Sequence, residues 1–207
     1  KTAQEVGGDY YDFFEAPSGS LQIALGDATG HGLKAAFLVT VAKSYYQFMA
    51  GQFTFDELFQ RLSQGIAALN LNEMYLAFLL LEYNHYRAKL MAASMPPLFI
   101  YRAATDTVEE LKMRGMFLGS PIQLPYEEIE LHFAKGDVVL LMSDGLPELT
   151  NENEDLYGYE RVYKHFEELA RTHTPQSIIE HLIARATGWL DGHPYDDDIT
   201  LLVMKIK

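Results

Sequence analysis

Cysteine is absent from the 207-residue sequence. Its absence excludes disulfide scaffolds, thiolate zinc sites and enzymes with a cysteine nucleophile, and it is compatible with a reducing setting. A run of about 20 apolar residues, the length that spans a bilayer, is also missing, as is a secretory signal peptide. We therefore expect a cytoplasmic domain without membrane contact of its own, even if a larger protein around it is membrane-anchored.

Basic residues are few, with 16 Lys and Arg against 29 Asp and Glu and a formal net charge of −13. Such a field repels a nucleic-acid backbone, and no basic stripe opposes it, which argues against a nucleic-acid partner. Hydrophobic residues make up 48% of the chain, enough for a buried core. The length suits one domain over residues 1–207, and the first residue, Lys1, indicates the C-terminal part of a longer protein.

Several common catalytic motifs are missing as well. The seven histidines show no His-Glu-x-x-His spacing, and no Gly-x-Ser-x-Gly elbow is present. Leu33-Lys34-Ala35 is not the Gly-Lys-Ser/Thr of a phosphate-binding loop. Asn151–Gly158 resembles a calcium loop only superficially, because its glycine is misplaced. These absences argue against a zinc hydrolase, a serine hydrolase and a P-loop nucleotide site.

The spacing of hydrophobic residues predicts helices in some segments and strands in others. The predicted helices are 33–49, 55–69, 159–171 and 175–190, the last with Thr174 as N-cap and Pro175 at its first position. The predicted strands are a hairpin of 8–14 and 20–26, a meander of 74–82, 86–93, 97–103 and 107–111, a pair of 128–133 and 137–143, and a last strand 199–206. Alternation in the second strand predicts one buried face. The pattern indicates an α+β layered sandwich of antiparallel sheets and helices.

Four short acidic turns border the apolar strand-like runs. They are Gly7-Gly8-Asp9, Gly26-Asp27-Ala28-Thr29-Gly30-His31-Gly32, Ser143-Asp144-Gly145 and Asp196-Asp197-Asp198-Ile199-Thr200. If these strand ends converge, several carboxylates meet at one place, and Mg²⁺ and Mn²⁺ prefer such oxygen ligands. Two such ions activate water and stabilise displacement at phosphorus. The sequence therefore predicts a metal-dependent phosphatase.

Each turn also has a purely structural explanation. Asp27 or Thr29 could cap the following helix, while Gly30 and Gly32 supply positive φ. Asp-Gly is a common turn pair, Asp9 alone is an ordinary surface carboxylate, and the aspartate triplet is compatible with a solvated loop. Four such turns together favour the metal site. If the strand has already begun at Asp197 and Asp198, these neighbours point to opposite sides, so one is a ligand and the other orients it or carries a second role.

At these residues the chain resembles the SpoIIE-type (RsbU-like) bacterial serine phosphatases, within the metal-dependent, type-2C-like (PPM) protein phosphatase superfamily. The matching segments, in order, are Glu5–Phe14, Gly26–Gly32 with Ala35-Ala36, Lys135–Asp137, Ser143–Glu148 and Asp197–Leu201. The resemblance implies a four-layer α-β-β-α sandwich of two mainly antiparallel sheets flanked by helices. It also implies hydrolysis of phosphoserine or phosphothreonine by a water that two Mn²⁺ or Mg²⁺ ions activate.

The resemblance further assigns the metal ligands. Asp27 bridges the two ions and the Ala28 carbonyl joins it, Asp9 holds one ion, and Asp144 and Asp197 hold the other. Asp198 supports this set or carries a second role, and His31 is a proton donor or, in the favoured interpretation, a structural residue of its turn. The implied substrate is a phosphorylated anti-sigma-factor antagonist or a similar regulator. An upstream sensor in the same chain is implied too, and a homodimer is left open.

The chain departs from the family pattern at two places. Ala93-Ser94-Met95-Pro96 stands where many relatives carry Gly-His before a proline, and Ala77 replaces a frequent threonine. No arginine is assigned to phosphate, so Arg102, Arg114 and Arg161 have no predicted role. The departures keep a second hypothesis open, a partner-docking module without turnover or with conditional activity. A metal phosphodiesterase or small-molecule phosphatase is the third.

Overall fold

The computed structural model describes residues 7–71, 73–122 and 124–207. They divide into two units: residues 7–95 with 113–132 form the N-terminal unit, and residues 96–112 with 133–207 form the C-terminal unit. The prediction of one domain over the whole chain is not tested by this division. None of the helices in the described ranges has the length and apolar character that crossing a membrane requires.

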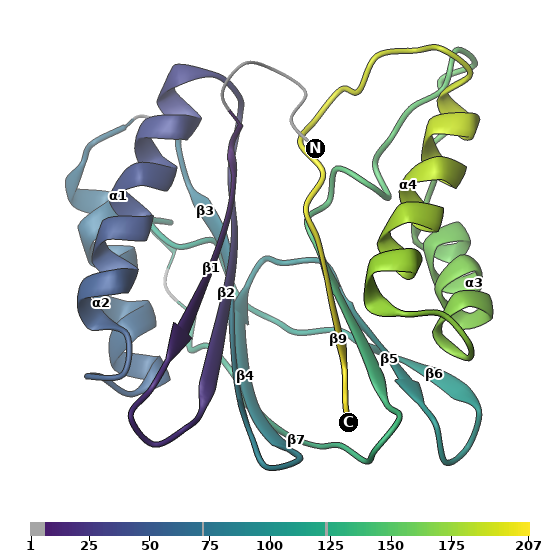
Figure 1. Cartoon of the computed structure of the whole chain (residues 1–207). Coiled ribbons are helices and arrows are strands. Elements are labelled where there is room, and N and C mark those ends of the chain that lie inside the picture. The colour runs from purple at the N-terminus through teal and green to yellow at the C-terminus, as the bar shows by residue number, and fades with distance from the viewer. Residues whose placement is uncertain (1–6, 72, 123) are drawn as a thin grey trace. The chain divides into compact units, whose positions relative to one another are not determined.

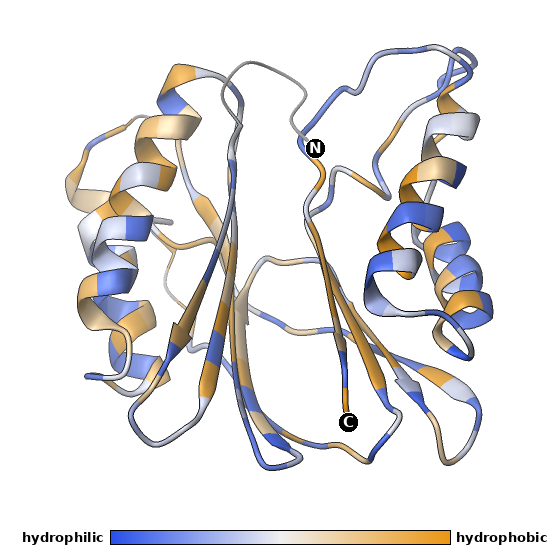
Figure 2. Ribbon diagram, in the orientation of Figure 1, coloured by the Kyte–Doolittle hydropathy of each residue, from blue (hydrophilic) through white to orange (hydrophobic). Residues whose placement is uncertain are grey.

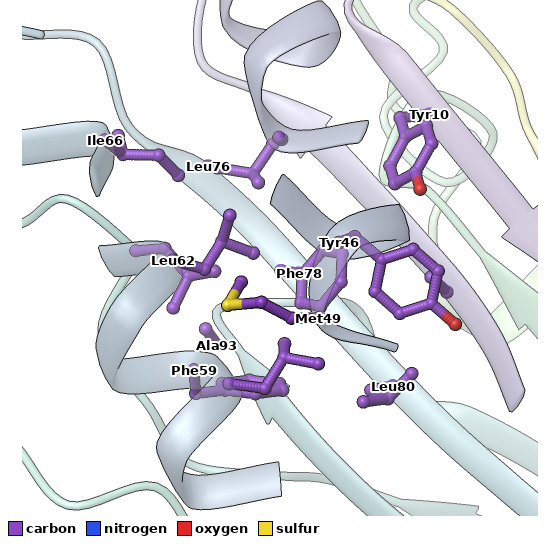
Figure 3. Packing of buried hydrophobic residues seen from close by; sticks show 14 of the residues in the cluster. Tyr10, Tyr46, Met49, Phe59, Leu62, Ile66, Leu76, Phe78, Leu80 and Ala93 are labelled. Carbon is purple, nitrogen blue, oxygen red and sulfur yellow. The ribbon is translucent and has the colours of Figure 1, made fainter. Parts of the chain in front are cut away.

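The N-terminal unit contains a five-stranded antiparallel sheet in the order β1-β2-β3-β4-β7. Its strands are β1 (Asp9–Glu15), β2 (Leu21–Ala28), β3 (Leu76–Asn84), β4 (Arg87–Ala93) and β7 (Glu128–His132). Two helices, α1 (Leu33–Met49) and α2 (Phe55–Ala68), lie along this sheet (Figure 1). The core between them centres on Phe78, whose ring meets those of Phe59 and Tyr46 at 5.5 and 6.2 Å (Figure 3).

Strand β2 is buried on both faces, so the prediction of one buried face is wrong. Gln22, expected on the polar face, is only 3% exposed. Its amide donates a 2.6 Å hydrogen bond to the Glu82 carboxylate of the neighbouring strand, which satisfies the buried group. Alternation of residue type thus understated how far both faces of this strand are buried.

The C-terminal unit contains a four-stranded antiparallel sheet in the order β6-β5-β8-β9. Its strands are β5 (Leu98–Arg102), β6 (Thr107–Leu111), β8 (Val138–Met142) and β9 (Leu201–Lys205), and its helices are α3 (Tyr159–Ala170) and α4 (Pro175–Leu190). Both helices alternate hydrophobic with hydrophilic positions (Figure 2), and their buried residues join the core of this sheet. The predicted cap of α4 is confirmed, because the Thr174 hydroxyl accepts the Ser177 N–H.

The predicted helices and strands are found with small shifts at their ends, but two predicted strand pairings are wrong. Strands β4 and β5 do not continue one meander, and β7 and β8 do not form a hairpin, because each pair is divided between the two sheets. Met95-Pro96-Pro97 separates the first pair, and proline has no N–H with which to continue a ladder. Strand β8 is buried throughout and pairs on both sides, whereas β7 is half exposed and occupies a sheet edge. The α+β class is confirmed.

Candidate metal centre

Asp9 and Asp27 face each other across strands β1 and β2. The Ala28 N–H donates to the Gly8 carbonyl at 3.0 Å, which makes 8 and 28 a hydrogen-bonded pair. The next pair, Asp9 and Asp27, is therefore a non-hydrogen-bonded pair, the position where facing residues approach most closely, with Cα atoms about 4.5 Å apart. The strand register thus puts two carboxylates side by side at the end of a hairpin.

Both carboxylates project from the sheet face away from α1 and α2. Tyr10 and Ala28, their immediate neighbours, pack into the core that these helices cover. Successive side chains alternate across a strand, so Asp9 and Asp27 point to the other face. Asp9 and Asp27 therefore present two carboxylates on the same face of the sheet.

The alternative in which Asp27 or Thr29 caps α1 is wrong. Asp27 lies within β2, and the N-cap of α1 is Gly32, which among the described residues has no side-chain capping bond. The Thr29 hydroxyl instead accepts the Tyr75 N–H at 2.9 Å, and so ties the end of β2 to the segment before β3. The predicted positive φ is confirmed at Gly30 (80°) and Gly32 (76°).

The backbone around Ala28 leaves little space for a side chain at position 8. A Cβ at Gly8 would lie 3.3 Å from the Ala28 carbonyl oxygen and 3.5 Å from that of Gly30. A larger residue at position 8 would therefore press on the carbonyl that the sequence suggested as a ligand. His31 lies in the loop between β2 and α1 and is exposed.

In the C-terminal unit, Asp144 directly follows Ser143 at the end of β8. The Ser143 N–H donates to the Thr200 carbonyl, and the Thr200 N–H donates to the Ser143 hydroxyl, both at 3.0 Å. The Asp197 carboxylate accepts the Asp198 N–H at 2.8 Å. Asp197 is exposed whereas Asp198 is 6% exposed. Both precede β9 (Leu201–Lys205), so alternation along a strand does not apply to them.

Glu148 is an acidic neighbour that the sequence reasoning did not single out. Burial, and then the charges of Asp144 and Asp197, raise the pKa of the Glu148 carboxyl above its usual range. The Tyr159 pKa rises to about 12 through burial and the charges of Asp144 and Glu148. The Glu148 N–H donates to the Asp144 carbonyl at 2.9 Å, which places Glu148 one turn after Asp144. The four-residue spacing between Asp144 and Glu148 is the sequence signal that could have identified Glu148.

The predicted ligands thus form two groups, Asp9 with Asp27 and Asp144 with Asp197. Carboxylate and carbonyl oxygens are the donors that hard divalent cations prefer, so the residue types fit Mn²⁺ or Mg²⁺. Within residues 7–71, 73–122 and 124–207, no cluster of three or more His, Cys, Asp or Glu residues is arranged to hold a metal ion. Glu5 and Val6 of the opening motif lie outside the described residues.

The two departures from the family pattern lie on β3 and at the end of β4. Ala77 is its partner on β3, so a methyl group stands next to the carboxylate. Ser94 follows the end of β4, with φ of 55°, and its hydroxyl donates to the Gly115 carbonyl at 2.9 Å. The serine therefore has a structural role in its turn.

Two of the unassigned arginines also have structural partners. Arg102 pairs with Asp137 at 3.1 Å and with Glu109 at 2.9 Å. Arg161 donates to the Leu156 and Tyr157 carbonyls and lies 4.0 Å above the Trp189 ring. Their guanidinium groups support the fold of the C-terminal unit.

Known proteins resemble this chain along its whole length. The phosphoserine phosphatase RsbU of Bacillus subtilis (strain 168) is 27% identical over 218 residues, and the match covers 99% of this chain and 61% of RsbU. The chain therefore spans less than two thirds of that relative.

Solved structures show the same fold. The SiaA-PP2C domain of Pseudomonas aeruginosa has a TM-score of 0.85 at 23% identity, covering 100% of this chain and 83% of that one. The RsbU and RsbW domains of Rv1364c from Mycobacterium tuberculosis have a TM-score of 0.75 at 20% identity, covering 98% and 56%. The predicted type-2C-like phosphatase fold is confirmed.

The family model described as stage II sporulation protein E (SpoIIE) matches residues 17–207, which is most of the sequence. The resemblance seen in the sequence motifs is confirmed, and the chain belongs to the SpoIIE family.

Proposed function

We propose that this chain is a Mn²⁺- or Mg²⁺-dependent protein phosphatase domain that hydrolyses phosphoserine or phosphothreonine. The observation that carries the proposal is the pairing of Asp9 with Asp27 at a non-hydrogen-bonded position of one hairpin. Like charges that face each other across strands repel, and cations bound by both carboxylates would offset this repulsion. Membership of the SpoIIE family supports the same reaction.

Each carboxylate has a distinct part in this proposal. In the N-terminal unit, Asp9, Asp27 and the Ala28 carbonyl would hold divalent cations. In the C-terminal unit, Asp144 and Asp197 would do so, with Asp198 supporting Asp197. Two bound divalent cations supply an activated water for in-line attack at phosphorus. His31 stands in the loop that follows Asp27, either as a proton donor to the leaving alkoxide or as a structural residue of that loop.

The proposed substrate is a phosphorylated regulatory protein, of the anti-sigma-factor-antagonist type. RsbU is named as a phosphoserine phosphatase, and another similar structure carries RsbU and RsbW domains in one protein. The proposal includes an upstream sensor module in the same protein. We place the reaction in the cytoplasm and leave a homodimer as a further hypothesis.

The decisive experiment is hydrolysis of p-nitrophenyl phosphate with Mn²⁺ and with EDTA, using wild-type protein and Asp27→Asn. A neutral amide lacks the negative charge with which the Asp27 carboxylate would hold cations. We therefore expect turnover to need Mn²⁺ and to fall at least about 100-fold in the variant, the scale of losing a main electrostatic contribution. Asp56→Asn, an exposed aspartate on α2, is the matched control and should keep wild-type turnover. Full activity of Asp27→Asn would overturn the assignment.

Comparing substrates separates the related enzymatic hypothesis. A phosphoprotein phosphatase should hydrolyse a phosphoserine-bearing regulator more efficiently than small phosphoesters or phosphodiesters at the same Mn²⁺ concentration. Binding of the regulator surface, remote from the phosphate, is what would raise kcat/KM for the protein substrate. A preference for a phosphodiester or for a small phosphoester would favour the third hypothesis.

One observation favours the second hypothesis, a docking module. Helix α1 exposes large apolar side chains, with Leu33 83% and Phe48 73% exposed, and Phe37 and Tyr45 also at the surface. Exposed apolar patches mark protein interaction sites. If the domain acts by docking, Phe48→Ser should lower its affinity for the regulator at least about 10-fold, a loss of roughly 1.4 kcal/mol of binding free energy. Calorimetry measures this affinity. Lys43→Ser is the control on the same helix, and equal binding by both variants would remove this hypothesis.

A further inference from the structure

Ser143 is a fully buried serine in the acidic turn Ser143-Asp144-Gly145 of the C-terminal unit. Its exposed fraction is 0%. The hydroxyl accepts the Thr200 N–H at 3.0 Å and lies 3.5 Å from the Asp198 carbonyl, to which it donates. The Ser143 hydroxyl therefore bonds to two residues, Asp198 and Thr200, of the segment that carries Asp197.

The backbone pairing shows why this hydroxyl matters. Strands β8 and β9 pair up to Met142 and Leu201, and the next pair in register is Ser143 with Thr200. The Ser143 N–H makes the expected bond to the Thr200 carbonyl at 3.0 Å, but the returning Thr200 N–H bonds to the Ser143 hydroxyl. The Ser143 hydroxyl oxygen thus accepts the bond that the Ser143 carbonyl would accept in a regular ladder. The β8–β9 ladder ends here, where the chain turns towards Asp144.

The turn after Ser143 also touches the opposing segment directly. A Cβ at Gly145 would collide with the carbonyl oxygen of Asp198 and lie 2.9 Å from its carbonyl carbon. The two backbones are therefore in van der Waals contact, with Ser143 on one side of Asp144 and Gly145 on the other. Asp144 is held between these two contacts.

We propose that Ser143 is a positioning residue that fixes the spacing between the Asp144 and Asp197 carboxylates. The inference rests on the proposed function, in which these two aspartates hold a divalent cation. Asp144 and Asp197 repel each other, so the segments that carry them separate unless the backbone is held. A metal site tolerates donor errors of only about 0.2 Å, and groups that orient the ligands typically change metal affinity 10–100-fold.

The test is Mn²⁺ binding measured by calorimetry, without substrate, on wild-type protein, Ser143→Ala and Ser143→Cys. We expect both variants to bind Mn²⁺ about 10–100-fold more weakly, because neither keeps a good acceptor for the Thr200 N–H. Cysteine preserves most of the volume, so it decides the question if the alanine variant does not fold. Thermal unfolding in EDTA identifies the folded variants. Ser177→Ala, on α4, is the control and should bind as wild type.

A second readout separates positioning from general damage. At saturating Mn²⁺, kcat of a folded Ser143 variant should return to within about 3-fold of wild type, because the defect is in metal affinity. Wild-type Mn²⁺ affinity in a folded Ser143 variant would overturn the inference, and so would a kcat loss that Mn²⁺ does not restore.

Asp144→Asn distinguishes the failure of this inference from that of the proposed function. If Asp144→Asn binds Mn²⁺ as tightly as wild type, the proposed ligand set is wrong and the inference falls with it. If Asp144→Asn loses Mn²⁺ and a folded Ser143 variant does not, only the role of Ser143 is wrong.

Discussion

Gly145 shows how closely single residues are constrained near the predicted ligands. A Cβ at this position would collide with the Asp198 carbonyl. Gly145→Ala must therefore move the turn away from the opposing segment, and overpacking of this kind costs about 1–3 kcal/mol of unfolding free energy. Urea denaturation in EDTA measures this loss without any contribution from bound metal.

Gly188 is the matched control for this substitution. A Cβ there meets nothing within 4 Å, and the residue lies inside helix α4. Alanine is a better helix former than glycine, so Gly188→Ala should stabilise the protein by about 0.5–1 kcal/mol. Equal effects of the two substitutions would contradict the close contact assigned to Gly145.

At the scale of elements, helix α3 is joined to the segment before it by a titratable contact. The Tyr157 hydroxyl and the His165 Nδ1 atom are 2.8 Å apart. Burial lowers the pKa of the His165 imidazole, and Arg185 adds to this effect. The folded protein therefore favours neutral His165. Unfolded histidine takes up a proton near pH 6.5, so acidification through this pH lowers stability until the folded pKa is passed.

The pH dependence can be assigned to this histidine by substitution. Between pH 7.5 and 5.5, the thermal midpoint of the wild type should fall by more than that of His165→Gln, which has no group titrating there. His193→Gln, in the exposed loop after α4, is the comparison variant for the effect of a histidine-to-glutamine change. Identical pH profiles for wild type and His165→Gln would exclude His165 as the cause.

For the whole molecule, the net charge of −13 and the predicted metal site lead us to expect that stability depends on divalent cations. An ion that binds only the native state adds about 2.7 kcal/mol at 100 times its Kd. That corresponds to a rise in Tm of roughly 5–10 °C for a protein of this length, at about 2–4 °C per kcal/mol. We expect Mn²⁺ to raise the thermal midpoint beyond NaCl of equal ionic strength.

Salt screening and site binding are separated by Asp27→Asn. Screening of surface charge is common to both proteins and acts with NaCl as well. The variant should therefore keep the NaCl effect and lose the additional gain from Mn²⁺. The same Mn²⁺ gain in wild type and variant would show that the stabilisation comes from elsewhere on the acidic surface.

The sequence by itself determined the elements of this protein, their order and the family to which it belongs. Periodicity and caps are local: α1 spans its predicted residues, and Thr174 with Pro175 begins α4 as predicted. The apolar spacing of α1 did not identify its buried side, because Leu33, Phe37 and Phe48 are exposed. The motifs also located the acidic residues at strand ends. Their metal-binding roles stay predictions, because they depend on what the residues bind.

Only the tertiary structure decided which strands pair and which side chains face each other. β7 joined β4, and β8 joined β5 and β9, because pairing depends on burial and hydrogen bonds between distant segments. The carboxylates are a second example, because the pairing register of β1 with β2 put Asp9 opposite Asp27. Ser143 met Thr200 through contacts 57 residues apart in sequence, which no local pattern encodes.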